Sequence, residues 1–331
     1  MKNQIQFIVD ELTRPTKRPL VILMTSTHPM TDTNLLKTGH QFYNLDIPQF
    51  PIKWNGNMPE NMHIIQDINQ LPHRPDLIIS QNITDQHNVF SQLGYTFDCP
   101  IIEFEHTVPS PEWIKLKIPE QIMNQVHNVI KFVYITDYSR KEWGNPDGVV
   151  LYHMVNSDIY KGWTGGNGHA AMMCNAFAGR EWAVGDIAKL MELDTENRIM
   201  LFGGNPGFDS QVLRTPMEVA STLSEFDVFV NTSIRSPIPA SLLEAASIGM
   251  PIVSTKTCAI PEFFTEGENI RYFETYEECL KIVDELLADK EQRERLGAAA
   301  RNVILEKFNE ERYVADWNKI LYEAVGAYNH A

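Results

Sequence analysis

The sequence has few cysteines and lacks any long apolar run. These two features argue against a cysteine-based metal site and against a membrane-spanning helix. The cysteines form no Cys-x-x-Cys pair and show no metal-ligand spacing, so reduced thiols in a cytoplasm are expected. They are Cys99, Cys174, Cys258 and Cys279. No apolar run approaches the roughly 20 residues that cross a bilayer. The N-terminal stretch MKNQIQFIVDELTRPTKRP has no signal-peptide core, so we expect a cytoplasmic location.

An excess of basic residues is also absent. The 331 residues include 28 Lys and Arg against 43 Asp and Glu, a net charge of −15. Broad binding to nucleic acid is therefore disfavoured, because phosphate contacts need clustered cations. The first 150 residues are less acidic, with 12 Lys and Arg against 16 Asp and Glu, and they hold seven of the ten histidines. The charge of this half is compatible with a local anion-binding surface.

Several catalytic motifs are missing as well. There is no Asp-x-Asp pair to hold a divalent cation on a nucleoside diphosphate, so a metal-free site is expected. There is no Gly-x-Ser-x-Gly elbow and no Walker loop.

What is present is a repeated alternation of short apolar runs and helical patterns. In the first half, apolar runs end in polar residues: RPLVILMTSTHP, PDLIISQNITD, CPIIEFEHTVP and IKFVYITDYS. The second half starts again with GVVLYHMVN and continues through AAMMCNAFAG, NRIMLFGGNPG, EFDVFVNTSI and GMPIVSTKT. Short apolar runs that end in polar residues are typical of buried parallel strands, and ligands of such folds bind beyond the carboxyl ends of the strands. Two such series predict an α/β fold with two doubly wound domains that face each other across a cleft.

The stretch SPIPASLLEAASIGMPIVS, residues 236–254, is the most informative part of the second half. It follows the apolar strand FDVFVNTSI, and its two prolines make a stiff loop before a helix. We expect Ser241 to cap that helix and Glu244 to lie in its first turn. The free N–H groups and the positive dipole end would suit a phosphate, and Glu244 would accept hydrogen bonds from ribose hydroxyls. An ordinary βαβ unit with a dipole-favoured carboxylate is the alternative.

The segment LSEFDVFVNTSIRSPIPASLLEAASIGMPIVSTKTCAIPEFF resembles the nucleotide-sugar-binding half of retaining glycosyltransferases of the GT-B fold, family GT4. That family has a strand, a loop, an "lEAma.G.PVv" helix and strand, and a "pE" turn. The matching pieces are Leu243–Ala246, Gly249, Pro251–Val253 and Pro261–Glu262. The segments IMLFGGNPG and LYHMVNSDIYKG, together with FEHTVPSPEW of the first half, are also similar to family segments.

The sequence departs from the family at three places. The first of the family's two spaced glutamates is Ser236 here, while the second is kept as Glu244. Asn175 replaces the family's phosphate-binding Arg, and Arg180 takes the place of its Lys. The glycine-rich loop after the first strand is replaced by TSTHPMTDT. These changes leave the transferred sugar, the catalytic strength and the acceptor open.

The resemblance implies a GT-B architecture. Residues 1–151 would form an acceptor-side Rossmann-like domain and residues 152–310 a nucleotide-sugar-binding one. Residues 311–331, around Trp317 and Tyr322, would form a helix that packs back on the first domain. His106 and Arg180 are the candidate catalytic residues, His106 near the donor sugar or acceptor and Arg180 on the leaving diphosphate. The donor-binding candidates are Gly203, Gly204, Asn205, Ser236, Ile238, Pro239, Ala240, Ser241, Leu242 and Glu244. The acceptor-side candidates, chosen by position alone, are Thr25, Ser26, Thr27 and His28.

The predicted activity is transfer of a sugar from a nucleoside diphosphate sugar, UDP-linked rather than GDP-linked, to a hydroxyl group. Retention and a metal-free, cofactor-free site follow from the resemblance. The acceptor stays open among a small molecule, lipid, glycan, protein or hydroxymethylated DNA base. Two other functions stay open: a non-catalytic nucleotide-sugar-binding scaffold, which Ser236 and Asn175 favour, and a sugar epimerase of related fold. The oligomeric state is not predicted.

Overall fold

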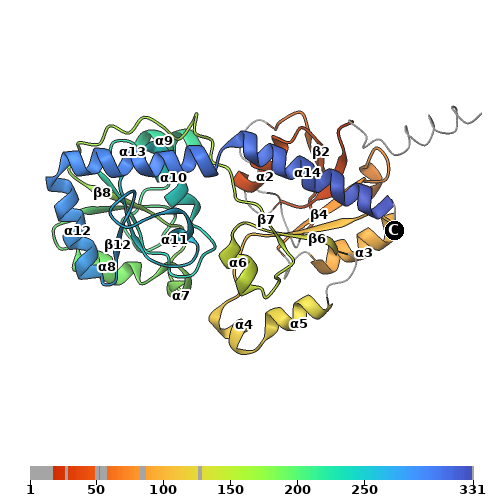
Figure 1. The fold of residues 1–331 in the computed structure, drawn as a ribbon, viewed down its shortest axis with the longest axis horizontal. Helices are drawn as coiled ribbons and strands as arrows, with labels where there is room; N and C mark the ends of the chain where they lie inside the picture. The colour runs from red at the N-terminus through yellow and green to blue at the C-terminus, as the bar shows by residue number, and fades with distance from the viewer. Residues whose placement is uncertain are drawn as a thin grey trace, which may run out of the picture.

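A computed structural model describes residues 18–26, 29–48, 52, 58–82, 87–125 and 129–329. Its strands form two sheets, and every strand pairing among these residues is parallel. The two sheets lie side by side along the longest axis of the molecule (Figure 1).

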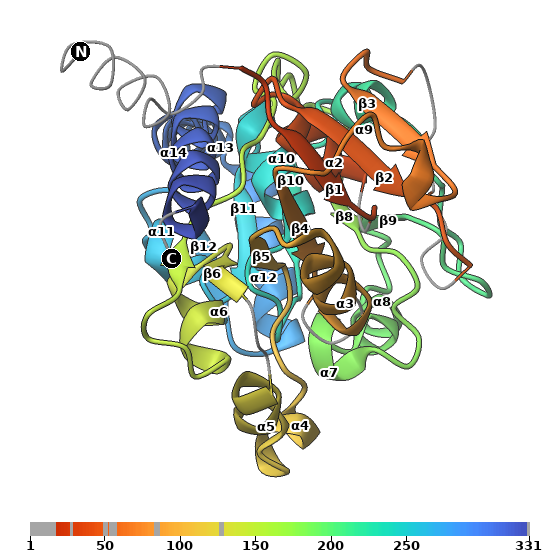
Figure 2. The ribbon, with the colours of Figure 1, turned by 90° about the vertical axis from the view of Figure 1, so that its right-hand side faces the viewer.

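The first sheet has seven strands in the order β3-β2-β1-β4-β5-β6-β7. They are β1 Val21–Met24, β2 Gln41–Leu45, β3 Met62–Ile65, β4 Leu77–Gln81, β5 Ile101–Glu105, β6 Val129–Tyr134 and β7 Val149–Val150. Its helices are α2 Pro29–Leu36, the 3₁₀ turn η1 Ile68–Gln70, α3 His87–Phe97, α4 Pro111–Lys115, α5 Ile118–Gln125 and α6 Asp137–Glu142. Helices α4 and α5 project from the body of the molecule (Figure 2).

The second sheet has five strands in the order β12-β11-β10-β8-β9. They are β8 Ala170–Met173, β9 Ile199–Phe202, β10 Val228–Asn231, β11 Ile252–Thr255 and β12 Arg271–Phe273. Its helices are α7 Glu181–Val184, α8 Ile187–Leu193, α9 Pro216–Leu223, α10 Ala240–Ile248, α11 Ile260–Phe263, α12 Tyr276–Ala288 and α13 Lys290–Lys307, and the last helix of the chain is α14 Glu310–Asn329.

Both faces of each sheet are buried, which explains the continuous apolar runs in the sequence. In β1, Ile22 and Met24 belong to one core cluster while Leu23 belongs to another, because successive side chains point to opposite faces. In β10, Phe229 and Val230 divide in the same way between the two cores of the second sheet. Parallel sheets covered on both faces are the expected result of strands that alternate with helices.

Two details of the predicted elements are wrong. The run GVVLYHMVN does not open the second sheet: its β7 pairs with β6 at the edge of the first, and β8 is the first strand of the second. The apolar spacing of REWAVGDIAKLMEL, residues 180–193, predicts one helix, but the structure has two, α7 and α8, separated at Gly185. A Cβ atom there would lie 2.6 Å from the Thr232 carbonyl oxygen, and the φ angle of +79° also favours glycine.

Helix α14 returns to the first sheet. Helices α13 and α14 form a nearly continuous line that runs over the second sheet and then over the first (Figure 1). Trp317 and Tyr313 of α14 are fully buried and share a core cluster with Ile22 and Phe104 of the first sheet. The predicted boundary at 151/152 lies between β7 and β8, and the division into domains at that point stays a prediction.

Candidate functional site

The start of α10 presents backbone N–H donors that have no acceptor among the described residues, near the carboxyl end of β10. Pro239 is the N-cap residue, and no side chain in the described part of the chain caps the helix. The first N–H groups of a helix have no partner within it, so those of Ala240, Ser241 and Leu242 point out of this end. The prediction that Ser241 caps the helix is wrong, because it is the second residue of α10. Its N–H group nevertheless belongs to the uncapped end.

The loop between β10 and α10 is held on two sides. The N–H groups of Ile234 and Arg235 both donate to the Ala183 carbonyl of α7, at 2.9 Å. On the other side, the N–H of Ser236 donates to the Cys258 sulfur at 3.1 Å. The loop is therefore positioned before any ligand binds.

The contacts of the loop indicate which groups its predicted donor-binding residues could offer to a ligand, and their role in donor binding stays a prediction. Ile238 is 5% exposed and belongs to the second-sheet core, so its side chain packs rather than lining a site. Pro239 has no N–H to offer, and the N–H of Ser236 already donates to Cys258. Leu242 is fully buried and contributes backbone only.

Glu244 lies in the second turn of α10, not in the first turn as predicted. Its Oε1 accepts a hydrogen bond from the Tyr160 hydroxyl at 2.9 Å. Burial raises the pKa of Glu244 to about 7, and the bond from Tyr160 opposes that shift in part. Tyr160 was not predicted as a site residue, although it lies in the segment LYHMVNSDIYKG that resembles the family.

The loops that follow β8 and β9 are joined by side-chain amides. Asn175 accepts the N–H of Gly204 at 2.8 Å, and Asn205 donates to the Cys174 carbonyl at 2.8 Å. A Cβ atom at Gly203 would collide with that same carbonyl, so the local packing accounts for this glycine without a ligand. Asn205 is buried, and its amide nitrogen is already engaged.

Arg180 is exposed at the N-cap position of α7, immediately beyond β8. One guanidinium nitrogen donates to the Asn175 carbonyl at 3.1 Å. Asn175, which replaces the family's Arg, therefore helps to hold the arginine that replaces the family's Lys. The other donors of the Arg180 fork can bind a phosphate.

In the first domain, polar side chains gather at the carboxyl ends of β1, β4 and β5. The Gln81 amide nitrogen donates to the Thr25 carbonyl at 3.1 Å and to Asp32 at 3.0 Å. Ser26 also donates to the Asp32 carboxylate, and the Gln81 amide oxygen lies 3.0 Å from Nε2 of His106. Thr25 and Ser26 thus belong to the same cluster as His106. The other two acceptor-side candidates, Thr27 and His28, lie outside the described residues.

The amide of Gln81 decides which nitrogen of His106 carries a proton. Both amide hydrogens are taken by acceptors, so the amide oxygen must face the imidazole and Nε2–H must donate to it. The ring also stacks on His153 with a centroid separation of 5.7 Å and an interplanar angle of 9°. Gln81, Asp32 and His153 were not predicted, because only the fold brings them beside His106.

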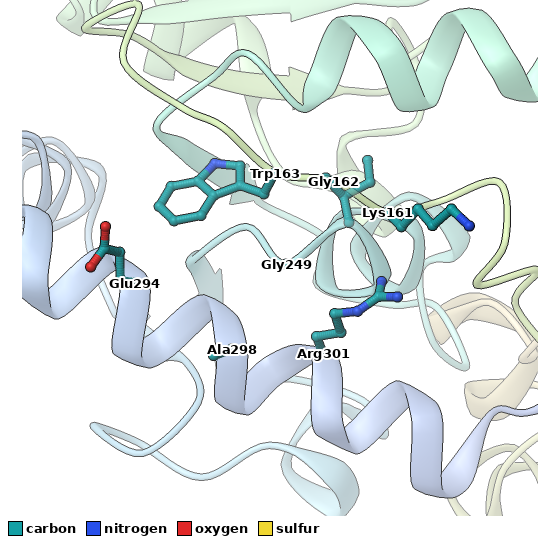
Figure 3. A pocket seen from close by; sticks show the side chains of 8 residues that line it. Lys161, Gly162, Trp163, Gly249, Glu294, Ala298 and Arg301 are labelled. Carbon is teal, nitrogen blue, oxygen red and sulfur yellow. The ribbon is translucent and has the colours of Figure 1, made fainter.

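A cavity of about 500 Å³ lies at the other end of α10, away from these groups. It is lined by Trp163, Gly249 and Arg301, among others, and α13 forms one side of it (Figure 3). Gly249 is the C-cap of α10, so this cavity is separate from the candidate site at the helix start.

In the described ranges, no group of three or more His, Cys, Asp or Glu side chains is placed to hold a metal ion. No helix in this part of the chain is long and apolar enough to cross a membrane.

Comparison with known proteins supports the resemblance. Residues 180–319 match the model of a glycosyl transferase-like family. A segment of 110 residues, 32% of this chain, is 28% identical to N-acetyl-alpha-D-glucosaminyl L-malate synthase of Bacillus anthracis. The chain spans only 29% of the length of that relative.

Solved structures show the fold over most of the chain. The Anabaena protein HepE in complex with UDP-glucose superposes with a TM-score of 0.69 at 13% identity, covering 92% of this chain and all of that one. Sucrose-phosphate synthase from Thermosynechococcus elongatus gives 0.74 at 12% identity, covering 94% of this chain and all of that one. The predicted resemblance to GT-B glycosyltransferases is confirmed, and the chain has the GT-B fold.

Proposed function

We propose that this chain, a protein of GT-B fold with a glycosyl transferase-like second domain, transfers a sugar from a UDP-linked donor to a hydroxyl group, as a member of family GT4. The observation that carries the proposal is the uncapped start of α10 beside β10, with Glu244 one turn further on. Such an end binds anions through N–H groups and the helix dipole. The UDP-glucose complex of HepE supports a UDP-linked donor.

In the proposed reaction, the bond between the anomeric carbon and the diphosphate oxygen breaks while the acceptor oxygen bonds to that carbon. The N–H groups of Ala240 to Leu242 and the guanidinium of Arg180 stabilise the negative charge on the leaving diphosphate. The departing phosphate oxygen takes the acceptor's proton, so attack occurs on the same face and the configuration is retained. No protein nucleophile and no metal ion are needed in this scheme.

We propose a small hydroxyl-bearing acceptor rather than DNA. Five cations of the first domain are paired with carboxylates within the fold: Arg18 with Asp76, Lys37 with Glu310, Lys131 with Glu323, and both Arg140 and Lys141 with the single carboxylate of Asp137. Three first-domain carboxylates are buried near the candidate site: Glu103 and Glu105 within β5, and Asp32 of α2 beside Ser26 and Gln81. A DNA backbone needs the opposite charge.

The test combines binding with turnover. UDP and UDP-sugars are titrated calorimetrically against the wild type and the Arg180→Ala variant, followed by an assay for UDP release. We expect UDP to bind and turnover to fall by roughly 100-fold or more in the variant, with an unchanged melting temperature because Arg180 is exposed.

The matched control is Arg295→Ala. Arg295 is also exposed and donates to the Gly267 carbonyl near the amino end of β12, at the opposite edge of the sheet. It is expected to leave turnover intact. Wild-type activity in Arg180→Ala would refute the role of Arg180. UDP binding without turnover by the wild type would instead favour a non-catalytic scaffold, which Ser236 at the family's glutamate position makes the second candidate.

A further inference from the structure

The side chain of Arg235 extends from the loop before α10 into the first domain. Its Nε donates to the Pro109 carbonyl at 2.7 Å, and its Nη2 lies 2.5 Å from the Glu142 carboxylate of α6. Its Nη1 lies 3.4 Å from the Tyr138 hydroxyl. The side chains of Arg235 and Glu142 are only 15% and 26% exposed, so solvent screens this ion pair less than a surface pair.

A second contact joins the same two regions. Glu262 of α11 accepts the N–H of Tyr138 at 2.9 Å, in the first turn of α6. Two residues of the second domain therefore contact helix α6, Glu262 at its start and Arg235 at its end. A carboxylate at a helix N-terminus and a cation at its C-terminus each suit the helix dipole.

These contacts lie away from the chain crossover, the place where the chain passes between the two domains at residues 151–155 and at the junction of α13 and α14. Near the crossover, Arg312 donates to the carbonyls of Tyr152 and His153, and Val155 donates to the Phe308 carbonyl. Figure 1 shows α6 and α4 facing α7 and α11 on the side opposite the line of α13 and α14. The Arg235 and Glu262 contacts would be broken by a hinge motion at the crossover, whereas the crossover contacts would be kept.

Arg235 also connects the two halves of the candidate site. It directly precedes Ser236 in the loop that leads to α10, and Pro109 lies three residues after His106 in the exit loop of β5. One side chain therefore ties the loop that would hold the diphosphate to the loop that carries His106.

We propose that Arg235 is a positioning residue. Together with Glu142 and Glu262 it forms an interdomain clasp, which holds the two domains in the closed arrangement and fixes the position of the start of α10 relative to His106. Its effect on catalysis rests on the proposed function, whereas its effect on domain closure does not. The clasp touches no reacting atom. It acts through the separation of the two loops, and a displacement of about 1 Å between reacting groups can cost 100-fold in rate.

The test measures closure and turnover separately in Arg235→Ala, Glu142→Gln and the double variant. Small-angle X-ray scattering, with and without UDP, reports the radius of gyration. We expect both single variants to be more extended than the wild type. We also expect kcat to fall by roughly 10- to 100-fold, with a smaller change in donor KM. The double variant should be no worse than Arg235→Ala, because both changes remove one interaction.

The control is Arg271→Ala, which removes an arginine paired with Glu266 and Glu285 inside the second domain. It should leave the scattering and kcat as in the wild type. If Arg235→Ala does not fold, as judged by circular dichroism, Glu142→Gln at the end of α6 carries the test. Wild-type scattering and wild-type kcat in a folded clasp variant would overturn the proposal. If the wild type transfers no sugar at all, the proposed function fails, and the scattering alone still decides whether the clasp exists.

Discussion

At the residue scale, burial controls the charge of Glu244. Its pKa of about 7 means that the folded protein binds this proton more tightly than the unfolded chain, whose ordinary value is 4.5. A raised folded-state pKa contributes stability at low pH that is lost as the pH rises through it. Ionised Glu244 would be the better acceptor for ribose hydroxyls. The same buried carboxylate lowers the free energy of unfolding near neutral pH.

The Glu244→Gln variant should remove this pH dependence. Below about pH 4.5 the two proteins should have similar free energies of unfolding, and between pH 5 and pH 8 the variant should become more stable by up to about 3 kcal/mol. Urea denaturation at a series of pH values measures the difference. Glu225→Gln, at an exposed glutamate of the same domain, serves as the control and should follow the wild type. Parallel wild-type and Glu244→Gln curves would show that folding leaves the pKa of Glu244 at its ordinary value and would contradict this account of the site.

Sequence could indicate Glu244 and Arg180 because each lies in a local pattern, a helix start or a strand exit. It could not indicate Tyr160, Gln81 or Arg235. The partner of Tyr160 is Glu244, 84 residues away, and Arg235 meets Glu142 across 93 residues. Contacts of that kind depend on how the sheets are placed, and no local spacing encodes them.

At the element scale, β1, β4, β5, β6, β8, β9, β10 and β11 were predictable because each lies in a short apolar run. Strands β2, β3 and β12 were not predicted, because each is only partly buried and contains polar residues. Two further predictions failed for different reasons. Val149–Val150 is only two residues long, so its apolar pattern did not show which sheet it joins. The break between α7 and α8 arises from the close approach of Gly185 to Thr232, a contact with a distant loop.

Helix α14 should supply much of the stability of the first domain. Trp317 is fully buried against Phe104 of β5, with ring centroids 4.7 Å apart. Trp317→Ala should cost about 3–5 kcal/mol of unfolding free energy, and the loss should appear in the first sheet. Hydrogen exchange followed by mass spectrometry measures it there. Trp182→Ala is the control, because that side chain is 46% exposed, and it should cost about 0.5 kcal/mol or less. Equal effects from both would contradict this account of α14.

At the scale of the whole molecule, two parallel sheets place their strand ends around one proposed reaction site. The second sheet would contribute the diphosphate-binding start of α10, and the first would contribute His106 with Gln81 and Asp32. Overall charge and composition excluded classes of function but did not locate this site. The crossover of α14 and the clasp at Arg235 decide how the two sheets face each other, and these depend on the assembled fold.

A crystal structure of the protein with UDP would show whether the start of α10 binds the diphosphate. We expect the diphosphate to lie within hydrogen-bonding distance of the N–H groups of Ala240, Ser241 and Leu242. We also expect the ribose hydroxyls on Glu244 and the Arg180 side chain turned toward the phosphates. UDP bound elsewhere, for example in the cavity beside Trp163 and Arg301, with the start of α10 left unoccupied, would contradict this expectation.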